Sequence, residues 1–508
     1  MARSLPDLVR RVNQRGDISV VTACDAEASN LSSQSIFLAI VIARSILLGE
    51  RPAPRQPFES KHTFRMLFQN RHHPDAALSL LLTCGFLGAR LCCSSASHDG
   101  DWPQWRGPLL TGQAPSADPP ISWSETENVK WKVMVPGFGT STPVVWGDQV
   151  FILTAVATGK GTAPESPSHS GPRASKELHQ FVVTAYARKT GKELWRTVVN
   201  ETAPHEGHHV DHGFASASPV TDGDRLWAFF GSRGLHCLDL QGKLLWSKDL
   251  GRMRTRNSFG EGSSPALHAD KLVICWDDET DNDFVAAFDK TTGSELWRKP
   301  RDEATGWSTP LIVVYQGKAQ VVINATKRVR SYDLADGTQL WEAGGQTANT
   351  IPTPVASVDT VYVTSGFRGS TLQAIALGRS GDLTGTDAIR WSLDQNTPYV
   401  PSPLLSGRFL FFVAANKAEI SCVHAKTGAI QFGGQRLEGM TGIYASPVSA
   451  KDRVYILGRN GLCYVLRLGP NLEVISRNKI DDRTDASPAL AGTEIFLRGH
   501  KALYCISH

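Results

Sequence analysis

Histidine and carboxylate side chains are concentrated in one short stretch of the chain, ETAPHEGHHVDHGFAS (201–216). Imidazoles and carboxylates are common ligands of Zn²⁺, Cu²⁺ and Ni²⁺, but the spacing here matches no closed zinc motif. The preferred interpretation is a polar loop whose histidines hydrogen-bond neighbouring loops, and a transition-metal site is the alternative. The residues concerned are His205, Glu206, His208, His209, Asp211 and His212.

A second stretch, WDDETDNDF (276–284), alternates acidic residues at Asp277, Glu279, Asp281 and Asp283. In a strict strand these four side chains would share one face, and in a loop they could wrap a hard cation such as Ca²⁺. The stretch has no glycine at the bend and no distal glutamate of the EF-hand type. A solvated acidic hairpin tip is therefore the preferred interpretation, with a Ca²⁺ site as the alternative.

Cationic and aromatic residues predict a ligand-binding face. RMRTRNSFGEG (252–262) contains three arginines that can neutralise the neighbouring acidic loop or bind an anionic ligand through two nitrogens each. The chain contains neither a G-x-S-x-G nucleophile elbow nor a glycine-rich phosphate loop. The predicted face comprises Arg252, Arg254, Arg256, Glu261, Trp307, Tyr399 and Tyr444.

A repeat predicts the elements that position these residues. A Ser/Thr-Pro pair followed by an apolar residue recurs at Pro143, Pro219, Pro265, Pro310, Pro354, Pro403, Pro447 and Pro488. After the first interval, the spacings are 46, 45, 44, 49, 44 and 41 residues, the length of one four-stranded propeller blade. Within each unit, alternating apolar runs are separated by Gly, Asp and Asn turns, as in antiparallel meanders.

The fourth strand of each unit opens with a pattern of the form TGxxLW, for example TGKELW (190–195) and TGSELW (292–297). One large flat side chain per unit can fill the wedge between neighbouring blades. Cysteines instead occupy a position that other units give to small residues, which predicts buried thiols that pack as small apolar groups. The aromatic position holds Trp195, Trp246, Trp297, Trp341, Trp391 and Phe432, and the small position holds Cys237, Cys422 and Cys505.

The ends of the repeat predict ring closure. The eighth unit begins at Ser487-Pro488 and ends after three strands at His508, whereas NVKWKVMVP (128–136) supplies a fourth strand with Trp131 at the blade position. Joining the two ends in one blade removes the open sheet edges. The sequence thus predicts an all-β, eight-bladed propeller over residues 98–508.

The N-terminal residues predict export. Residues 66–97 combine a basic flank, the apolar stretch 76–91 and the small residues Ser95-Ala96-Ser97, as a signal peptide does. Residues 1–65 do not fit in front of such a signal, and we interpret them as a non-structural upstream extension. A formal net charge of +4 without a dense basic run gives no indication of nucleic-acid binding. No apolar run after residue 97 is long enough to span a bilayer.

The TGxxLW and Ser-Pro-Val strand starts, together with the turn FDKTTG (288–293), resemble pyrroloquinoline-quinone-like repeats. The opening DWPQWRGP (101–108) is similar to the start of a group of exported bacterial propellers with such repeats. The resemblance spans residues 101–508. It implies a location in the periplasm, in the cell envelope or outside the cell.

Two functional branches share these repeats. One is similar to the scaffold lipoprotein of the outer-membrane β-barrel assembly machine, and the other comprises quinoprotein dehydrogenases with the quinone and Ca²⁺ at the ring centre. The dehydrogenases bear an adjacent Cys-Cys disulfide, and the only such pair here is Cys92-Cys93, in the signal segment. We therefore expect a non-enzymatic propeller that binds a protein or an envelope glycan at its mouth, with a quinone-dependent dehydrogenase as the alternative.

Overall fold

The structure is a computed structural model that describes residues 100–161 and 176–508, which belong to one compact unit. The segments interpreted as an upstream extension (1–65) and a signal peptide (66–97) lie outside these residues. No helix in the described ranges is long and apolar enough to cross a membrane.

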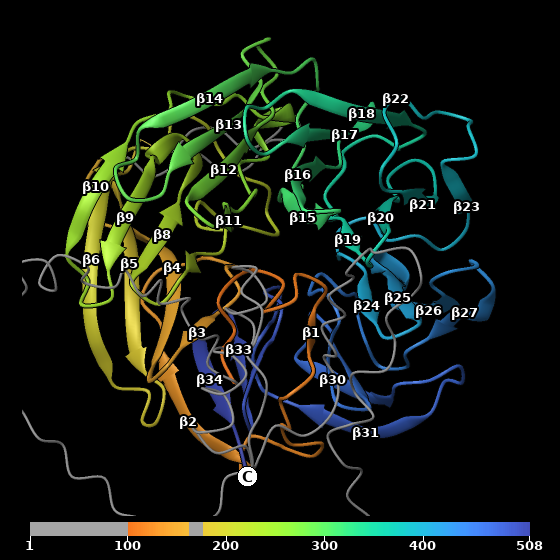
Figure 1. Ribbon diagram of the computed structural model, residues 1–508. Coiled ribbons are helices and arrows are strands. Elements are labelled where there is room, and N and C mark those ends of the chain that lie inside the picture. Colours follow the sequence, from red (N-terminus) through yellow and green to blue (C-terminus); the bar gives the residue numbers. More distant parts are fainter. Residues whose placement is uncertain (1–99, 162–175) are drawn as a thin grey trace, which may run out of the picture. The chain divides into compact units, whose positions relative to one another are not determined.

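Eight antiparallel sheets of four consecutive blade strands surround a common centre, which confirms the predicted fold class (Figure 1). We number the blades in chain order. Blade 1 comprises β3 (Val144–Trp146), β4 (Gln149–Ala157), β5 (His179–Ala187) and β6 (Glu193–Thr202). Blade 2 comprises β7 (Val220–Thr221), β8 (Arg225–Phe229), β9 (Leu235–Asp239) and β10 (Leu244–Lys248). Blade 3 comprises β11 (Ala266–His268), β12 (Lys271–Trp276), β13 (Phe284–Asp289) and β14 (Glu295–Pro300). Blade 4 comprises β15 (Leu311–Tyr315), β16 (Lys318–Ile323), β17 (Arg328–Asp333) and β18 (Gln339–Gly344).

The remaining blades follow the same order. Blade 5 comprises β19 (Val355–Ala356), β20 (Thr360–Ser365), β21 (Thr371–Ala376) and β23 (Ile389–Leu393). Blade 6 comprises β24 (Leu404–Ser406), β25 (Phe409–Ala414), β26 (Glu419–His424) and β27 (Ile430–Arg436). Blade 7 comprises β28 (Val448–Ala450), β29 (Arg453–Leu457), β30 (Leu462–Arg467) and β31 (Val474–Lys479). Within the described ranges, helix is confined to the 3₁₀ segments η2 (Gly231–Arg233), η3 (Arg256–Ser258) and η4 (Ala415–Lys417).

Blade 8 combines strands from both ends of the described chain. Its inner strands are β32 (Ala489–Ala491), β33 (Glu494–Arg498) and β34 (Ala502–Ile506), and its outer strand is β2 (Val129–Met134). Strand β2 pairs antiparallel with β34, and Trp131 lies opposite Cys505. Figure 1 shows β2 beside β34 although the two are far apart in sequence. Two short strands, β1 (Gln113–Ala114) and β22 (Gly381–Asp382), add in parallel to β28 and β18.

In five blades the repeated tryptophan joins the outer strand to the next blade. Trp297 of blade 3 donates from Nε1 to the carbonyl of Leu334, in the blade 4 turn between β17 and β18, at 3.0 Å. A Cβ at Gly337 in that turn would lie 2.6 Å from the Trp297 ring, and Gly337 has a φ of +75°. The glycine of the TGxxLW pattern is therefore required both by its backbone conformation and by the indole packed on it. The same contact recurs for Trp131 with Gly191, Trp195 with Gly242, Trp246 with Gly293, and Trp391 with Gly428.

The Ser/Thr-Pro pairs form a ring of hydrogen bonds around the inner strands. At each of seven seams between blades, the backbone amide of one Ser or Thr donates to the hydroxyl of the next blade. The donors are Thr142, Ser218, Ser264, Thr309, Thr353, Ser402 and Ser446, and the final acceptor is Ser487, at distances of 2.8–3.2 Å. The motif thus supplies a strand start and, through its hydroxyl, an acceptor for a neighbouring amide.

The predicted small-residue position is also observed. Trp246 lies opposite Cys237, and Phe432 lies opposite Cys422. The thiols of Cys237, Cys422 and Cys505 are free and buried, and burial raises the pKa of Cys237 and of Cys422 to about 12. These cysteines therefore pack as small apolar groups.

Residues 102–112 cross the inner ring and touch blades that are distant in sequence. Arg106 donates from Nη2 to the carbonyls of Pro403 (2.8 Å) and Pro447 (3.1 Å). Trp105 donates to the Thr353 hydroxyl at 3.2 Å, and burial lowers the pKa of Arg106 to about 9. This N-terminal segment therefore ties blades 5, 6 and 7 together.

Candidate functional site

The candidate site lies on the mouth face, the face formed by the loops that enter each blade and the loops between second and third strands. Two neighbouring loops supply most of the predicted site residues. The histidine loop (residues 203–219) joins β6 to β7, and the arginine loop (residues 249–265) joins β10 to β11. Their backbones meet where the His209 amide donates to the Phe259 carbonyl at 2.8 Å.

Histidine side chains fasten the histidine loop to the arginine loop. His205 Nε2 lies 2.5 Å from the Met253 carbonyl, and His212 Nε2 lies 2.5 Å from the Phe259 carbonyl. Because a carbonyl can only accept, Nε2 carries the proton in both rings. Burial lowers the pKa of His205 and lowers that of His212 to about 4, so His212 is neutral at pH 7. His208 instead donates from Nδ1 to the His209 carbonyl at 2.8 Å within its own loop.

Asp211 connects the histidine loop to residues near the C-terminal end of the chain. Its Oδ1 accepts from Arg459 at 2.5 Å and from Arg483 at 2.7 Å. Its Oδ2 accepts from the Tyr444 hydroxyl at 3.2 Å. His209 lies 3.7 Å from Asp211 but is 41% exposed. Asp211 is thus an ion-pair residue that anchors the loop to blades 7 and 8, and His208, His209 and His212 do not converge with it on a common point.

A different combination of side chains does converge. A ring nitrogen of His205 and one carboxylate oxygen each of Glu206 and Glu261 lie within 4.8 Å of one another. Glu206 accepts from the amide and hydroxyl of Thr255, the latter at 2.6 Å. Glu261 accepts from Arg233 at 2.9 Å. The structure therefore joins two residues of the histidine-rich stretch, His205 and Glu206, to one residue of the predicted ligand-binding face, Glu261.

The three predicted arginines line two depressions on the mouth face. Arg254 and Arg256 line one of about 650 Å³ together with His205 and Glu206. Arg252 lines another of about 570 Å³. Arg256 donates to the Asn349 side chain at 3.3 Å. In the described residues, no ion pair involves the exposed guanidinium groups of Arg252 and Arg254.

The predicted aromatic residues are half-buried and already make contacts. Trp307 donates from Nε1 to the Gly260 carbonyl of the arginine loop at 2.7 Å. Tyr444 lies under the Arg459 guanidinium, 3.9 Å from its ring centre. Burial, followed by the charge of Asp211, raises the pKa of Tyr444 to about 12. The Tyr399 ring stacks on Phe367 with their centres 4.9 Å apart. Trp307 and Tyr444 therefore support the two loops, and Tyr399 lies in the loop between blades 5 and 6.

The acidic stretch does not bring its carboxylates together, because residues 277–283 form a loop between β12 and β13 rather than a strand. Asp277 pairs with Arg301 at 2.8 Å, and both side chains are fully buried. Asp283 accepts from the Glu303 amide at 2.6 Å, and burial raises its pKa. The solvated-tip interpretation applies to Glu279 and Asp281, which are exposed. Glu279 also accepts from the Thr305 hydroxyl at 2.7 Å.

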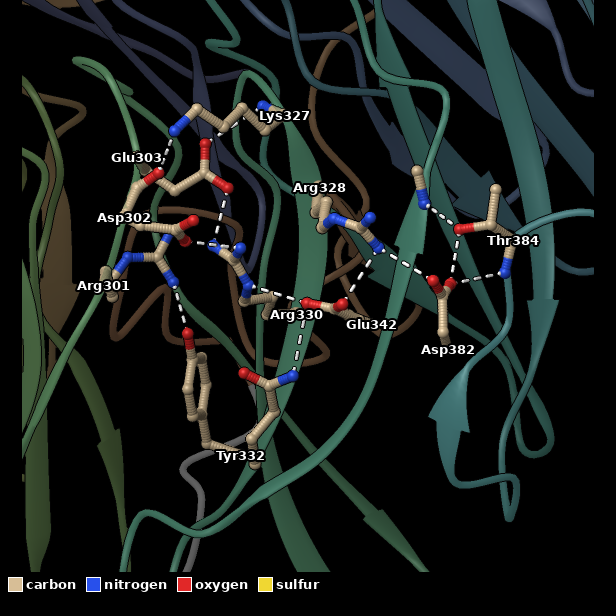
Figure 2. A network of polar contacts seen from close by, with 12 residues as sticks. Arg301, Asp302, Glu303, Lys327, Arg328, Arg330, Tyr332, Glu342, Asp382 and Thr384 are labelled. Carbon is tan, nitrogen blue, oxygen red and sulfur yellow. Dashed lines mark hydrogen bonds and ion pairs between the residues drawn. The ribbon is translucent and has the colours of Figure 1, made fainter.

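Beyond this loop, a polar network joins blades 3 and 4 (Figure 2). Arg330 donates to Glu303 at 2.7 Å and to Glu342 at 3.0 Å. Arg328 donates to Glu342 at 2.9 Å and to Asp382, in β22, at 3.1 Å. Figure 2 shows both guanidinium groups facing carboxylates. These arginines form ion pairs with carboxylates, whereas Arg252 and Arg254 form none in the part of the chain that the structure describes.

The residues present do not fit a quinone at the ring centre. The described cysteines, Cys237, Cys275, Cys422, Cys463 and Cys505, are free and lie in five different blades. Cys92-Cys93 lies outside the described residues. On the mouth face, Asp211 holds the histidine loop to Arg459 and Arg483.

Sequence reasoning missed two features of the site. Glu206 and Glu261 lie in two separate loops that each enter a blade. Both loops occupy the same position in the repeat, and only this equivalence could have predicted that the two residues meet. The partners of Asp211 lie more than 230 residues away. No local pattern marks them, because Arg459 and Arg483 lie in ordinary turns of blades 7 and 8.

The comparisons with known proteins agree on the fold. A family model described as "Outer membrane protein assembly factor BamB" matches residues 179–433. No curated protein sequence matches the chain. BamB from Moraxella catarrhalis is 12% identical, with a TM-score of 0.49 over 75% of this chain and 97% of that one.

Two quinohemoprotein alcohol dehydrogenases are also similar in structure. The enzyme from Comamonas testosteroni is 8% identical, with a TM-score of 0.52 and 81% of each chain covered. The enzyme from Pseudomonas putida HK5 is 8% identical, with a TM-score of 0.51 and 80% of each chain covered. At these identities the likeness shows the fold alone.

Proposed function

This chain belongs to the family described as outer membrane protein assembly factor BamB, and we propose from this premise that it is a non-catalytic propeller that binds a protein partner at its mouth face. The proposal includes export to the cell envelope, because residues 66–97 have the composition of a signal peptide. A binding role needs loops held in a fixed arrangement rather than a catalytic constellation.

The mouth-face loops are held in this way. The inner ring of hydroxyl-to-amide bonds fixes the start of each blade. His205 and His212 fasten the histidine loop to the arginine loop, and Asp211 fastens it to blades 7 and 8. Loops ordered before binding lose little conformational entropy when a ligand binds.

The observation that carries the proposal is the exposure of Arg252 and Arg254, neither of which forms an ion pair in the described residues. Carboxylates line the same depressions, with Asp278, Asp281 and Asp283 beside Arg252 and Glu279 beside Arg254. Both side chains are exposed, and Arg254 lines the depression of about 650 Å³ together with Arg256. Guanidinium groups bind carboxylates through two parallel hydrogen bonds. The partner that best fits this surface is a protein segment rich in Asp and Glu.

Charge reversal tests the proposal. We expect the double variant Arg252→Glu/Arg254→Glu to lose at least about tenfold in affinity for a poly-glutamate peptide, because attraction becomes repulsion across the depression. The matched control is Arg408→Glu/Lys426→Glu, which makes the same charge change at exposed turns on the opposite face of blade 6. Fluorescence anisotropy at two salt concentrations measures both.

Three outcomes would overturn this proposal. Equal loss in the control variant would show that only net charge matters. Unchanged binding in the mouth variant would place the ligand elsewhere, for example at an exposed blade edge used for strand addition. Preference for an acidic polysaccharide over the peptide would identify a glycan ligand instead of a protein.

A further inference from the structure

We propose that His205, Glu206 and Glu261 form a binding site for one divalent transition-metal ion, represented here by Zn²⁺. One ligand atom from each of the three lies within 4.8 Å of the other two. Across the described residues, this is the one place where three such side chains meet within that span. One imidazole and two carboxylates form a donor set that Zn²⁺ and Mn²⁺ accept.

The outer contacts of His205 suit a metal ligand. Its Nε2 donates to the Met253 carbonyl at 2.5 Å, which leaves the lone pair of Nδ1 free. Metal-ligating histidines commonly donate their other ring N–H to a carbonyl or carboxylate, which fixes the tautomer and the ring orientation. The backbone of the arginine loop therefore prepares His205 for coordination.

The two carboxylates are oriented in the same way. Glu206 accepts from the Thr255 hydroxyl at 2.6 Å, and its Oε2 has one further bond, of 3.1 Å, from the Thr255 amide. The Oε2 of Glu261 accepts one bond, from the Ser232 amide at 2.5 Å. A carboxylate oxygen has two lone pairs. One lone pair on each Oε2 therefore remains for an ion.

The charge of the cluster also favours a cation. Glu261 is paired with Arg233, and the side chains are 8% and 5% exposed. With His205 neutral, the two glutamates and this arginine leave one net negative charge. A bound divalent ion would compensate this charge.

Two of the three side chains of the cluster line an open depression, and the third lines a separate small cavity. His205 and Glu206 line the depression of about 650 Å³ on the mouth face, through which an ion can enter. Glu261 lines a separate small cavity of about 20 Å³, enough for about one water molecule. Three protein ligands with a water at the fourth position is a common arrangement for zinc.

The experiment is a calorimetric titration of metal-free full-length propeller with Zn²⁺. We expect one ion per chain, and we expect His205→Ala and Glu206→Gln each to weaken binding by about tenfold or more. The matched control is His209→Ala, which removes an exposed histidine of the same loop that is outside the cluster, and it should leave the affinity within about twofold of wild type. Circular dichroism checks that each variant is folded.

The absence of a stoichiometric site in the wild type would overturn the proposal, as would loss of binding in His209→Ala with retention in His205→Ala. A second measurement needs no variant. Anomalous diffraction from wild-type crystals soaked in Zn²⁺ should place one peak among the three side chains, and a peak elsewhere on the histidine loop would also overturn the proposal. Neither measurement depends on the partner inferred from Arg252 and Arg254.

Discussion

The seam between blades 8 and 1 differs from the seven seams that precede it along the chain. At each of those seven, an amide donates to a Ser or Thr hydroxyl of the next blade. At the eighth, the Thr142 hydroxyl is buried without a hydrogen-bond partner in the part of the chain that the structure describes. The tryptophan contact between neighbouring blades is still present at this seam, where Trp131 of blade 8 donates to the Arg188 carbonyl of blade 1 at 2.9 Å.

Arginine side chains make the missing connections at this seam. Arg498 of blade 8 donates to the Ser141 hydroxyl at 2.7 Å and to the Leu153 carbonyl at 2.5 Å. Arg188 of blade 1 contacts Glu494 at 2.5 Å and the Ala491 carbonyl at 2.9 Å. Blades 8 and 1 come from opposite ends of the described chain, and their inner strands are joined by buried charge rather than by the repeated hydroxyl.

The largest effect should follow from removing the Arg188 side chain. Arg188→Ala deletes bonds to both blades and leaves the Glu494 carboxylate, which is 8% exposed, with Lys130 as its ion-pair partner. We expect a loss of about 3–5 kcal/mol in the free energy of unfolding, because the buried carboxylates of Glu494 and Asp101 each lose a charged partner. Urea denaturation measures the loss.

The control for this change is Arg196→Ala. Arg196 pairs with Glu193 at 2.6 Å, with side chains 33% and 41% exposed, and exposed pairs contribute about 0–1 kcal/mol. If the two variants lost the same stability, the 8–1 seam would not depend on Arg188.

This difference also explains which parts of the fold were predictable. The Ser/Thr-Pro pairs and the TGxxLW pattern recur in register, so periodicity alone located the blades and the tryptophan position. Arg188 and Arg498 occur once each at their seam and follow no period. Their roles depend on the spatial meeting of the chain ends, and a single sequence carries no signal for that meeting.

The candidate site was less predictable for a related reason. Sequence composition drew attention to the histidine loop and the arginine loop. It did not show that Asp211 would be used by Arg459 and Arg483, or that Glu206 would meet Glu261. Loop side chains lack the period that fixes which way a strand residue points. Their partners are therefore decided by the packing of whole blades.

Lowering the pH should reduce the free energy of unfolding through the buried histidines of blade 2 and the mouth face, and not through the arginines of the 8–1 seam. His236 of blade 2 bonds to the Arg233 carbonyl at 2.9 Å and is 3% exposed. Burial lowers its pKa from 6.5 to about 4. Between these values the unfolded chain binds a proton that the folded chain does not, so stability is complete above pH 6.5 and is lost as the pH falls towards 4.

At pH 5 this linkage amounts to about 2 kcal/mol for His236 alone. We expect urea midpoints of the wild type to fall between pH 7 and pH 5, and we expect His236→Gln to show a smaller fall. Arg188→Ala leaves His236 and its contacts unchanged, so this variant should retain the wild-type pH dependence between pH 7 and pH 5. An equal fall in His236→Gln would assign the acid sensitivity to other groups.

The smallest effect should come from the hydroxyl ring itself, and it tests the comparison most directly. Ser264→Ala removes the acceptor of the Ser218 amide, a bond of 2.8 Å between buried groups, and should cost about 1–2 kcal/mol because that amide is left without a partner. Thr142→Val keeps the side-chain shape at the eighth position. Since its hydroxyl is buried without a partner, this change should cost about 0 kcal/mol or stabilise slightly. Urea denaturation of the two variants in parallel measures the difference. Equal losses would mean that the Thr142 hydroxyl is bonded in solution and that the ring continues through all eight seams.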